Sequence, residues 1–254
     1  MSITIESGIA TVIVSDPDRG CSLDIPGLDH AATVLREDDS IRAILLQGPD
    51  GMGFCNGGDV KAFAAAEDPG AYLAEIAAPF HRFISALRAI DAPSIAAVRG
   101  FAAGGGMSIA CAATLAVGGP GTRFLPAYPT IGFSTDGGLS WNLPRIVGNR
   151  QAARIILANQ LLDCTEAQRL GLLGDVTDTD ETVVPHARAI AEQLAGASRT
   201  ATSEILRLLR ASDTNALDEH LDAEASAIAR TAGSADGREG VAAFLAKRSP
   251  RFER

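Results

Sequence analysis

Two glycine clusters carry the clearest chemical signal in this chain. The pair at 57–58 follows the apolar run at 42–47, and the triplet at 104–106 follows the apolar run at 94–98. Glycine lets a backbone N–H group approach a ligand that a Cβ would exclude. Two such N–H groups can bind one oxygen that becomes negative during a reaction. The pattern therefore predicts an oxyanion hole.

Three further side chains could take part in catalysis, and each also has a simpler interpretation. Asp136 precedes two glycines, so by itself it predicts the N-cap of a helix running towards Trp141. His81 lies in an apolar helical segment, where a packed or surface histidine is the default. Ser108 stands in an incomplete G-x-S-x-G pattern. We interpret it as a small packing residue, because a nucleophile there needs a strained turn and later partners.

Composition indicates a soluble globular protein and excludes several partners. The chain has 254 residues, of which 46% are hydrophobic and 21% charged. Its net charge of −9 disfavours nucleic acid or an anionic membrane as the main partner. The four cysteines show no metal-ligand spacing, so we predict no metal site and expect reduced thiols in the cytoplasm. We expect no signal peptide, and no apolar run reaches the ~18 residues of a membrane span.

The order of apolar segments predicts an α/β fold with its active site at the carboxyl ends of strands. After about Gln151 the chain changes, and we expect five helical stretches interrupted by one short strand near 173–178. One narrow apolar stripe in this region predicts packing on a larger body. It consists of Leu217, Leu221, Ala225 and Ile228. The segments expected before Gln151 are a hairpin at 3–14, helices at 25–35, 71–90 and 105–113, and strands at 42–47, 94–98 and 114–117.

Four segments in order, at 53–61, 93–106, 128–138 and 236–248, resemble the signatures of the crotonase (enoyl-CoA hydratase/isomerase) superfamily. The resemblance runs nearly from end to end. It implies a crotonase-like (ClpP/crotonase) α/β spiral of β-β-α units, which we place at 1–195. It also implies a C-terminal helical region, at 196–254, that builds a homotrimer or a dimer of trimers.

The resemblance implies an acyl-CoA thioester as ligand, and with it a role in fatty acid metabolism. The N–H groups of Gly58 and Gly105 would hold the thioester oxygen and stabilise an enolate. Coenzyme A then enters as part of the substrate, so no separate cofactor is expected. Lys247 would reach the coenzyme from a neighbouring subunit. The predicted substrate-binding residues are Arg19, Cys55, Asn56, Asp59, Lys61, Tyr128, Phe244 and Lys247.

The departures from the resemblance decide the expected reaction. Hydratases of the superfamily use two glutamates, and the matching positions here hold Ser108 and Tyr128. Serine has no pKa suited to a general base, and tyrosine, with a pKa near 10, suits a donor better. Asp136 matches an aspartate that moves protons in other branches. The favoured hypothesis is therefore an enoyl-CoA isomerase-like proton shuttle with one aspartate.

Two alternatives stay open. His81 and Asp136 also match positions of the aroyl-CoA dehalogenase branch, which has tryptophan where this chain has Tyr128. Hydratase, hydrolytic or dehalogenase chemistry could then use His81 to activate water and Asp136 as nucleophile or base. The third hypothesis is a crotonase-fold protein that binds acyl-CoA without turnover.

Overall fold

The centre of the computed structural model, which describes residues 2–252, is a six-stranded sheet in the order β1-β2-β5-β6-β8-β11. β1 and β2 form the expected antiparallel hairpin, and the remaining neighbours pair in parallel. The six strands are β1 (Ile3–Glu6), β2 (Ile9–Ile13), β5 (Ala43–Gln47), β6 (Ser94–Val98), β8 (Leu115–Gly118) and β11 (Asp175–Val176).

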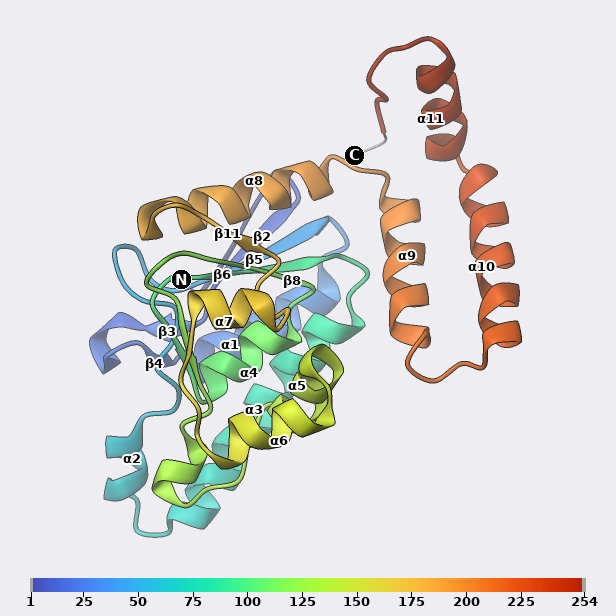
Figure 1. Cartoon of the computed structure of the whole chain (residues 1–254). Helices are drawn as coiled ribbons and strands as arrows, with labels where there is room; N and C mark the ends of the chain where they lie inside the picture. Colours follow the sequence, from blue (N-terminus) through green and yellow to red (C-terminus); the bar gives the residue numbers. More distant parts are fainter. Residues whose placement is uncertain (1, 253–254) are drawn as a thin grey trace.

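Helices cover both faces of this sheet (Figure 1). Ala43 and Leu45 of β5 face α8 (Val183–Ala195), whereas Ile44 and Leu46 belong to the larger core on the other face. Burial on both faces explains why the central strands read as continuous apolar runs. The helices that contribute to the larger core are α1 (Ile25–Glu37), α3 (Pro69–Ala89), α4 (Gly105–Ala112), α5 (Leu139–Val147), α6 (Asn149–Leu157) and α7 (Cys164–Arg169).

A second, three-stranded sheet was not predicted. It pairs β10 (Leu162–Asp163), β9 (Arg123–Leu125) and β7 (Phe101–Ala103). These strands have only two or three residues, which is too short for a periodic pattern. The glycine triplet at 104–106 therefore follows β7 directly, and not β6 as we had expected.

From Asn149 onward the described chain has six α-helices, where we expected five helical stretches after about Gln151. After α6, α7 and α8 come α9 (Arg199–Ala211), α10 (Leu217–Ala232) and α11 (Ala235–Leu245). In Figure 1, α10 and α11 stand apart from the central sheet. α9 is bonded to the core, because Ser203 Oγ donates to the Asp91 carbonyl at 3.2 Å and Arg210 Nη2 donates to the Ile90 carbonyl at 2.6 Å. Between residues 2 and 252, no helix has the length and apolar character needed to cross a membrane. The division of the chain at 195/196 stays a prediction.

A cluster around the single tryptophan attaches the α9–α10 connection to the core. The guanidinium groups of Arg88 in α3 and Arg145 in α5 lie 4.0 and 3.6 Å from the centre of the Trp141 ring. Both arginines also form ion pairs with Asp213, which lies between α9 and α10, at N···O distances of 3.7 and 3.3 Å. Through these contacts α3, α5 and the α9–α10 connection are joined around Trp141.

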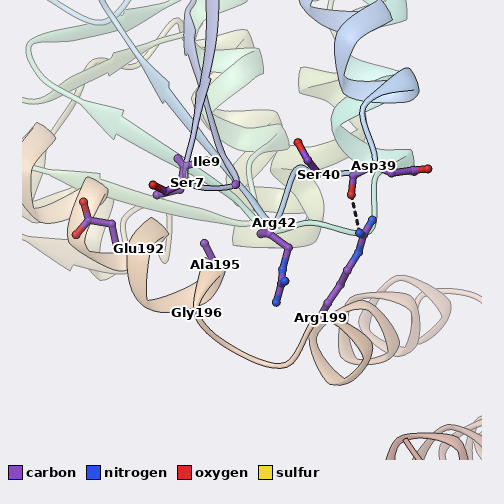
Figure 2. A pocket seen from close by; sticks show the side chains of 10 residues that line it. Ser7, Ile9, Asp39, Ser40, Arg42, Glu192, Ala195, Gly196 and Arg199 are labelled. Atoms are coloured by element: carbon purple, nitrogen blue, oxygen red, sulfur yellow. Dashed lines mark hydrogen bonds between the residues drawn. The ribbon is translucent and has the colours of Figure 1, made fainter. Parts of the chain in front are cut away.

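A cleft of about 530 Å³ lies where α8 joins α9 (Figure 2). Arg42 Nη2 donates to the carbonyl of Ala197 at 2.7 Å, and Arg199 Nη1 donates to the carbonyl of Asp39 at 2.5 Å. Arg42 immediately precedes β5, so the cleft lies at the opposite end of the parallel strands from the glycine clusters. Its arginines hold the start of the C-terminal helices to the core.

Candidate active site

The two glycine clusters pack backbone against backbone. Cys55 donates its N–H to the carbonyl of Phe101 and accepts from the N–H of Ala103, both at 2.9 Å. A Cβ added to Gly106 would lie 2.6 Å from the Cys55 carbonyl oxygen. Gly57 has a φ of +94°, and its Cβ would lie 3.0 Å from the Ala103 carbonyl oxygen. Only glycine allows this close approach.

Gly58 and Gly105 are sequence neighbours of the glycines that make these contacts, Gly57 and Gly106. Gly104, with a φ of +52°, turns the chain into α4, and Gly105 is the first residue of that helix. An N–H group at a helix start has no partner within the helix and lies at the positive end of its dipole. Neither Gly58 nor Gly105 donates its N–H to another residue of the described chain. The oxyanion hole stays a prediction with two available donors.

Asp136 and His81 meet, although 55 positions separate them in sequence. His81 Nε2 in α3 lies 2.5 Å from Asp136 Oδ1 in the loop before α5. The side chains are 53% and 40% exposed, so both groups are accessible from solvent. The simpler interpretation of Asp136 was wrong. Gly138 is the N-cap of α5, no side chain in the described range caps this helix, and the Asp136 carboxylate contacts His81.

Ser108 is more than the packing residue that the sequence indicated. It is fully buried in α4, and its hydroxyl donates to the carbonyl oxygen of Asp136 at 2.8 Å. The hydroxyl of Tyr128 lies 3.3 Å from Ser108 Oγ and 3.4 Å from the same carbonyl oxygen. Burial raises the pKa of Tyr128 to about 12, so its hydroxyl stays protonated at neutral pH.

Phe80 joins the second glycine cluster to the Asp136 loop. Its Cζ would lie 3.4 Å from a Cβ added to Gly105 and 2.6 Å from one added to Gly137. The ring is buried between these two backbone segments. One phenyl ring thus contacts both the start of α4 and the backbone next to Asp136.

An aromatic cluster extends from Gly58 to the loop that carries the acid. Phe63 Cζ would lie 2.4 Å from a Cβ added to Gly58. The Phe63 ring lies 6.0 Å from the Tyr72 ring and 6.4 Å from the Phe133 ring, between centroids. Sequence reasoning missed this cluster, since its members come from α2 (Val60–Ala65), α3 and the loop before α5.

Comparison with known proteins now decides the family. Residues 4–254 match the model of the enoyl-CoA hydratase/isomerase family. The chain belongs to this family. It is 33% identical over 255 residues to the 1,2-epoxyphenylacetyl-CoA isomerase of Escherichia coli strain K12, covering 98% of this chain and 96% of the relative. It is 29% identical over 253 residues to 4-chlorobenzoyl coenzyme A dehalogenase-2 of an Arthrobacter species, covering 97% and 91%.

Solved structures agree with this assignment. A crystal structure of an enoyl-CoA hydratase from Polaromonas sp. JS666 superposes with a TM-score of 0.90 at 29% identity, covering 99% of this chain and 98% of the other. The expected crotonase-like α/β fold with C-terminal helices is thus confirmed. The chain is an acyl-CoA-processing enzyme of the enoyl-CoA hydratase/isomerase family.

Three predicted substrate-binding residues of this family member have structural contacts of their own. Asp59 caps α2 by accepting from the N–H groups of Lys61 and Ala62, each at 3.1 Å. Asn56 Nδ2 donates to the carbonyl of Gly20 at 2.8 Å. Cys55 is buried, and burial raises the pKa of its thiol to about 12. These side chains shape the first glycine cluster, and their contacts with substrate stay predictions.

The predicted coenzyme-binding residues of the enoyl-CoA hydratase/isomerase site are not gathered within one chain. Arg19 is paired with Asp16 at 3.5 Å, and Lys61 is exposed on α2. Phe244 is 82% exposed on α11, and Lys247 follows that helix. Figure 1 places α11 far from α3 and α5, which flank the acid. A role for Phe244 and Lys247 at the site stays a prediction that needs a neighbouring subunit.

Proposed function

We propose that this enzyme shifts the double bond of an unsaturated acyl-CoA thioester by moving one proton, as an enoyl-CoA isomerase does. The observation that carries the proposal is the accessible Asp136 carboxylate, paired with His81 beside the glycine clusters. Asp136 removes a proton from the α- or γ-carbon, and the electron pair moves into an enolate held by the N–H groups of Gly58 and Gly105. The same carboxylic acid returns the proton at the other carbon.

The groups around the acid support isomerisation over hydration. The two positions at which hydratases of the superfamily carry glutamates hold the hydroxyls of Ser108 and Tyr128, and the pKa of Tyr128 is raised to about 12. Neither hydroxyl can serve as a base at neutral pH. A shuttle needs only one base, because the group that takes the proton also returns it. Relatives at 33% identity are named both as an isomerase and as a probable enoyl-CoA hydratase, so the preference rests on the residues at 108 and 128.

A panel of β,γ-unsaturated acyl-CoA thioesters incubated in D₂O tests the proposal. Mass spectrometry should show α,β-unsaturated isomers whose mass differs from that of the substrate only by deuterium at the acyl carbons. Products heavier by one water would instead identify a hydratase. If the protein binds the thioesters but leaves all of them intact and free of deuterium, the result would support the hypothesis that it binds acyl-CoA without turnover.

A second candidate reaction is displacement on an aryl-CoA. The His81–Asp136 pair and the aromatic cluster of Phe63, Tyr72 and Phe133 favour it, as does the likeness to a 4-chlorobenzoyl-CoA dehalogenase. Asp136 would displace chloride to form an aryl ester, and water activated by His81 would hydrolyse that ester. A single turnover of 4-chlorobenzoyl-CoA in H₂¹⁸O should then leave label in Asp136. Unlabelled protein and unchanged substrate would exclude this route.

We propose that the enzyme works as a homotrimer or a dimer of trimers, joined through α10 and α11. Large apolar side chains on these helices are 50–82% exposed in the single chain, and exposed apolar patches of this kind mark interfaces. Such an assembly would bring Phe244 and Lys247 to a neighbouring site. The side chains are Leu217, Leu221, Ile228, Val241, Phe244 and Leu245.

We expect Ile228→Glu to dissociate the assembly, because it places a charge on a surface that becomes buried. Sedimentation velocity should show a shift towards monomer. Ser226→Glu adds the same side chain at an exposed polar position of α10 and should leave the oligomer intact. A monomeric parent enzyme, or dissociation by both variants alike, would contradict the assembly through this face.

A further inference from the structure

We propose that Ser108 and Tyr128 are positioning residues that hold the acid through its main-chain carbonyl, an inference that rests on the proposed role of Asp136. The two hydroxyls and the Asp136 carbonyl oxygen form a small cluster, with separations of 2.8, 3.3 and 3.4 Å. Ser108 is fully buried in α4, and α4 begins at the predicted oxyanion-hole glycine. The cluster therefore connects the acid to the same helix that carries one oxyanion donor.

The proposed relay places one proton on each of these contacts, following the shorter distances. Each hydroxyl has one proton to donate. Ser108 Oγ lies 2.8 Å from the Asp136 carbonyl oxygen and 3.3 Å from that of Gly104, so the Asp136 oxygen receives the shorter bond. Tyr128 Oη lies 3.3 Å from Ser108 Oγ and 3.4 Å from the Asp136 carbonyl oxygen, and in the proposed relay its proton goes to Ser108 Oγ. The result is a relay in which Tyr128 orients Ser108, and Ser108 binds the carbonyl of Asp136.

The loop needs such a restraint. Residues 133–136 have no regular secondary structure, and glycines with positive φ lie on both sides, at Gly132, Gly137 and Gly138. Glycine restricts the backbone least of all residues. The Asp136 carbonyl accepts one turn bond from Leu139 N–H at 3.3 Å, which is local to the loop. The hydroxyl of Ser108 supplies a connection from the loop to a buried helix.

The relay also explains why hydroxyls fit at positions 108 and 128. A carbonyl oxygen binds donors only, and an ionised carboxylate has no proton to donate. A glutamate at 108 would place a negative charge against the Asp136 carbonyl and displace the loop. Because the pKa of Tyr128 is raised to about 12, the relay stays protonated throughout the ordinary working pH range. The acid loop as seen here and a carboxylate at position 108 therefore exclude each other.

Three variants test the proposal by turnover. We expect Ser108→Ala to lower kcat about 10²-fold, the loss typical of a ~1 Å misplacement of a catalytic group, with KM within about twofold. Tyr128→Phe keeps the ring and should lower kcat about tenfold. The double variant should match Ser108→Ala, because one relay is broken in both. A change in KM alone would overturn the relay. So would a double variant whose loss in kcat equals the product of the two single losses.

Amide exchange provides a readout that does not depend on activity. By hydrogen–deuterium exchange mass spectrometry, Ser108→Ala should exchange about tenfold faster in peptides covering 132–139 and at the parent rate in β5 and β6. Tyr128→Phe should do the same to a smaller extent, and it serves if Ser108→Ala fails to fold. Unchanged exchange in 132–139 would refute the relay. Faster exchange in an enzyme that isomerises nothing would refute only the proposed reaction.

Discussion

Asp136→Asn will abolish proton exchange at the acyl carbons while leaving acyl-CoA binding intact. Asparagine keeps the size of the side chain but cannot take up a proton, and general base catalysis contributes about 10²–10⁴-fold to rate. We expect a loss of about 10³-fold in deuterium incorporation from D₂O into the acyl chain. The affinity for a saturated acyl-CoA, measured by calorimetry, should stay within about twofold, because the predicted coenzyme contacts lie elsewhere.

The matched control is Asp50→Asn, which changes the net charge equally at an exposed aspartate in the loop after β5. It should retain parent activity. Full exchange activity in Asp136→Asn would show that another group moves the proton. An equal loss in both variants would show that the effect comes from charge and not from the acid.

Gly106→Ala should destabilise the fold and inactivate the enzyme together. Alanine within a helix is ordinarily more stable than glycine by roughly 0.5–1 kcal/mol. At this position the new Cβ would lie 2.6 Å from the Cys55 carbonyl oxygen and 2.7 Å from the Cys55 Cβ. Overpacking of this kind costs about 1–3 kcal/mol, so the substitution should lower the stability of the fold and not raise it. Urea denaturation should show a lower midpoint.

The loss of turnover in Gly106→Ala should exceed the loss of stability. Moving α4 away from Cys55 separates Gly105 from Gly58, and losing one oxyanion donor typically costs about 10²–10³-fold in kcat. Gly240→Ala is the control, since it lies inside α11 and its Cβ would meet nothing closer than 3.7 Å. That variant should be slightly more stable and fully active. A stable, active Gly106→Ala would disprove the close packing of the two glycine clusters.

Long elements were predictable because their signals are local. The mostly apolar run Ser94–Val98 predicts β6 at its observed bounds. Asp24 with Pro26 predicts the start of α1, where Asp24 Oδ1 accepts from Gly27 N–H at 3.1 Å. The short strands β7, β9 and β10 were missed, because pairing with distant segments forms them. The turn at Asp136 was misread, since an Asp-Gly-Gly run permits several turn geometries.

The sequence could name candidate residues for the site but not their arrangement. Glycine clusters and a resemblance to family signatures identified Gly58, Gly105, Asp136 and His81 as candidates. The 2.5 Å contact between His81 and Asp136 joins two elements that no local pattern relates. The same is true of the relay from Tyr128 through Ser108. Such contacts depend on how helices pack over the sheet, and a single sequence does not encode that packing in a readable pattern.

The indole ring of Trp141, with two guanidinium groups against it, gives this enzyme an intrinsic fluorescent probe. Trp141 is the sole tryptophan, so all indole emission comes from one place. Its two arginine neighbours are held by Asp213 from the connection between α9 and α10. Any movement of these C-terminal helices that breaks those ion pairs changes the electric field at the ring, and with it the emission wavelength. Docking of the helices can thus be followed in real time without a label.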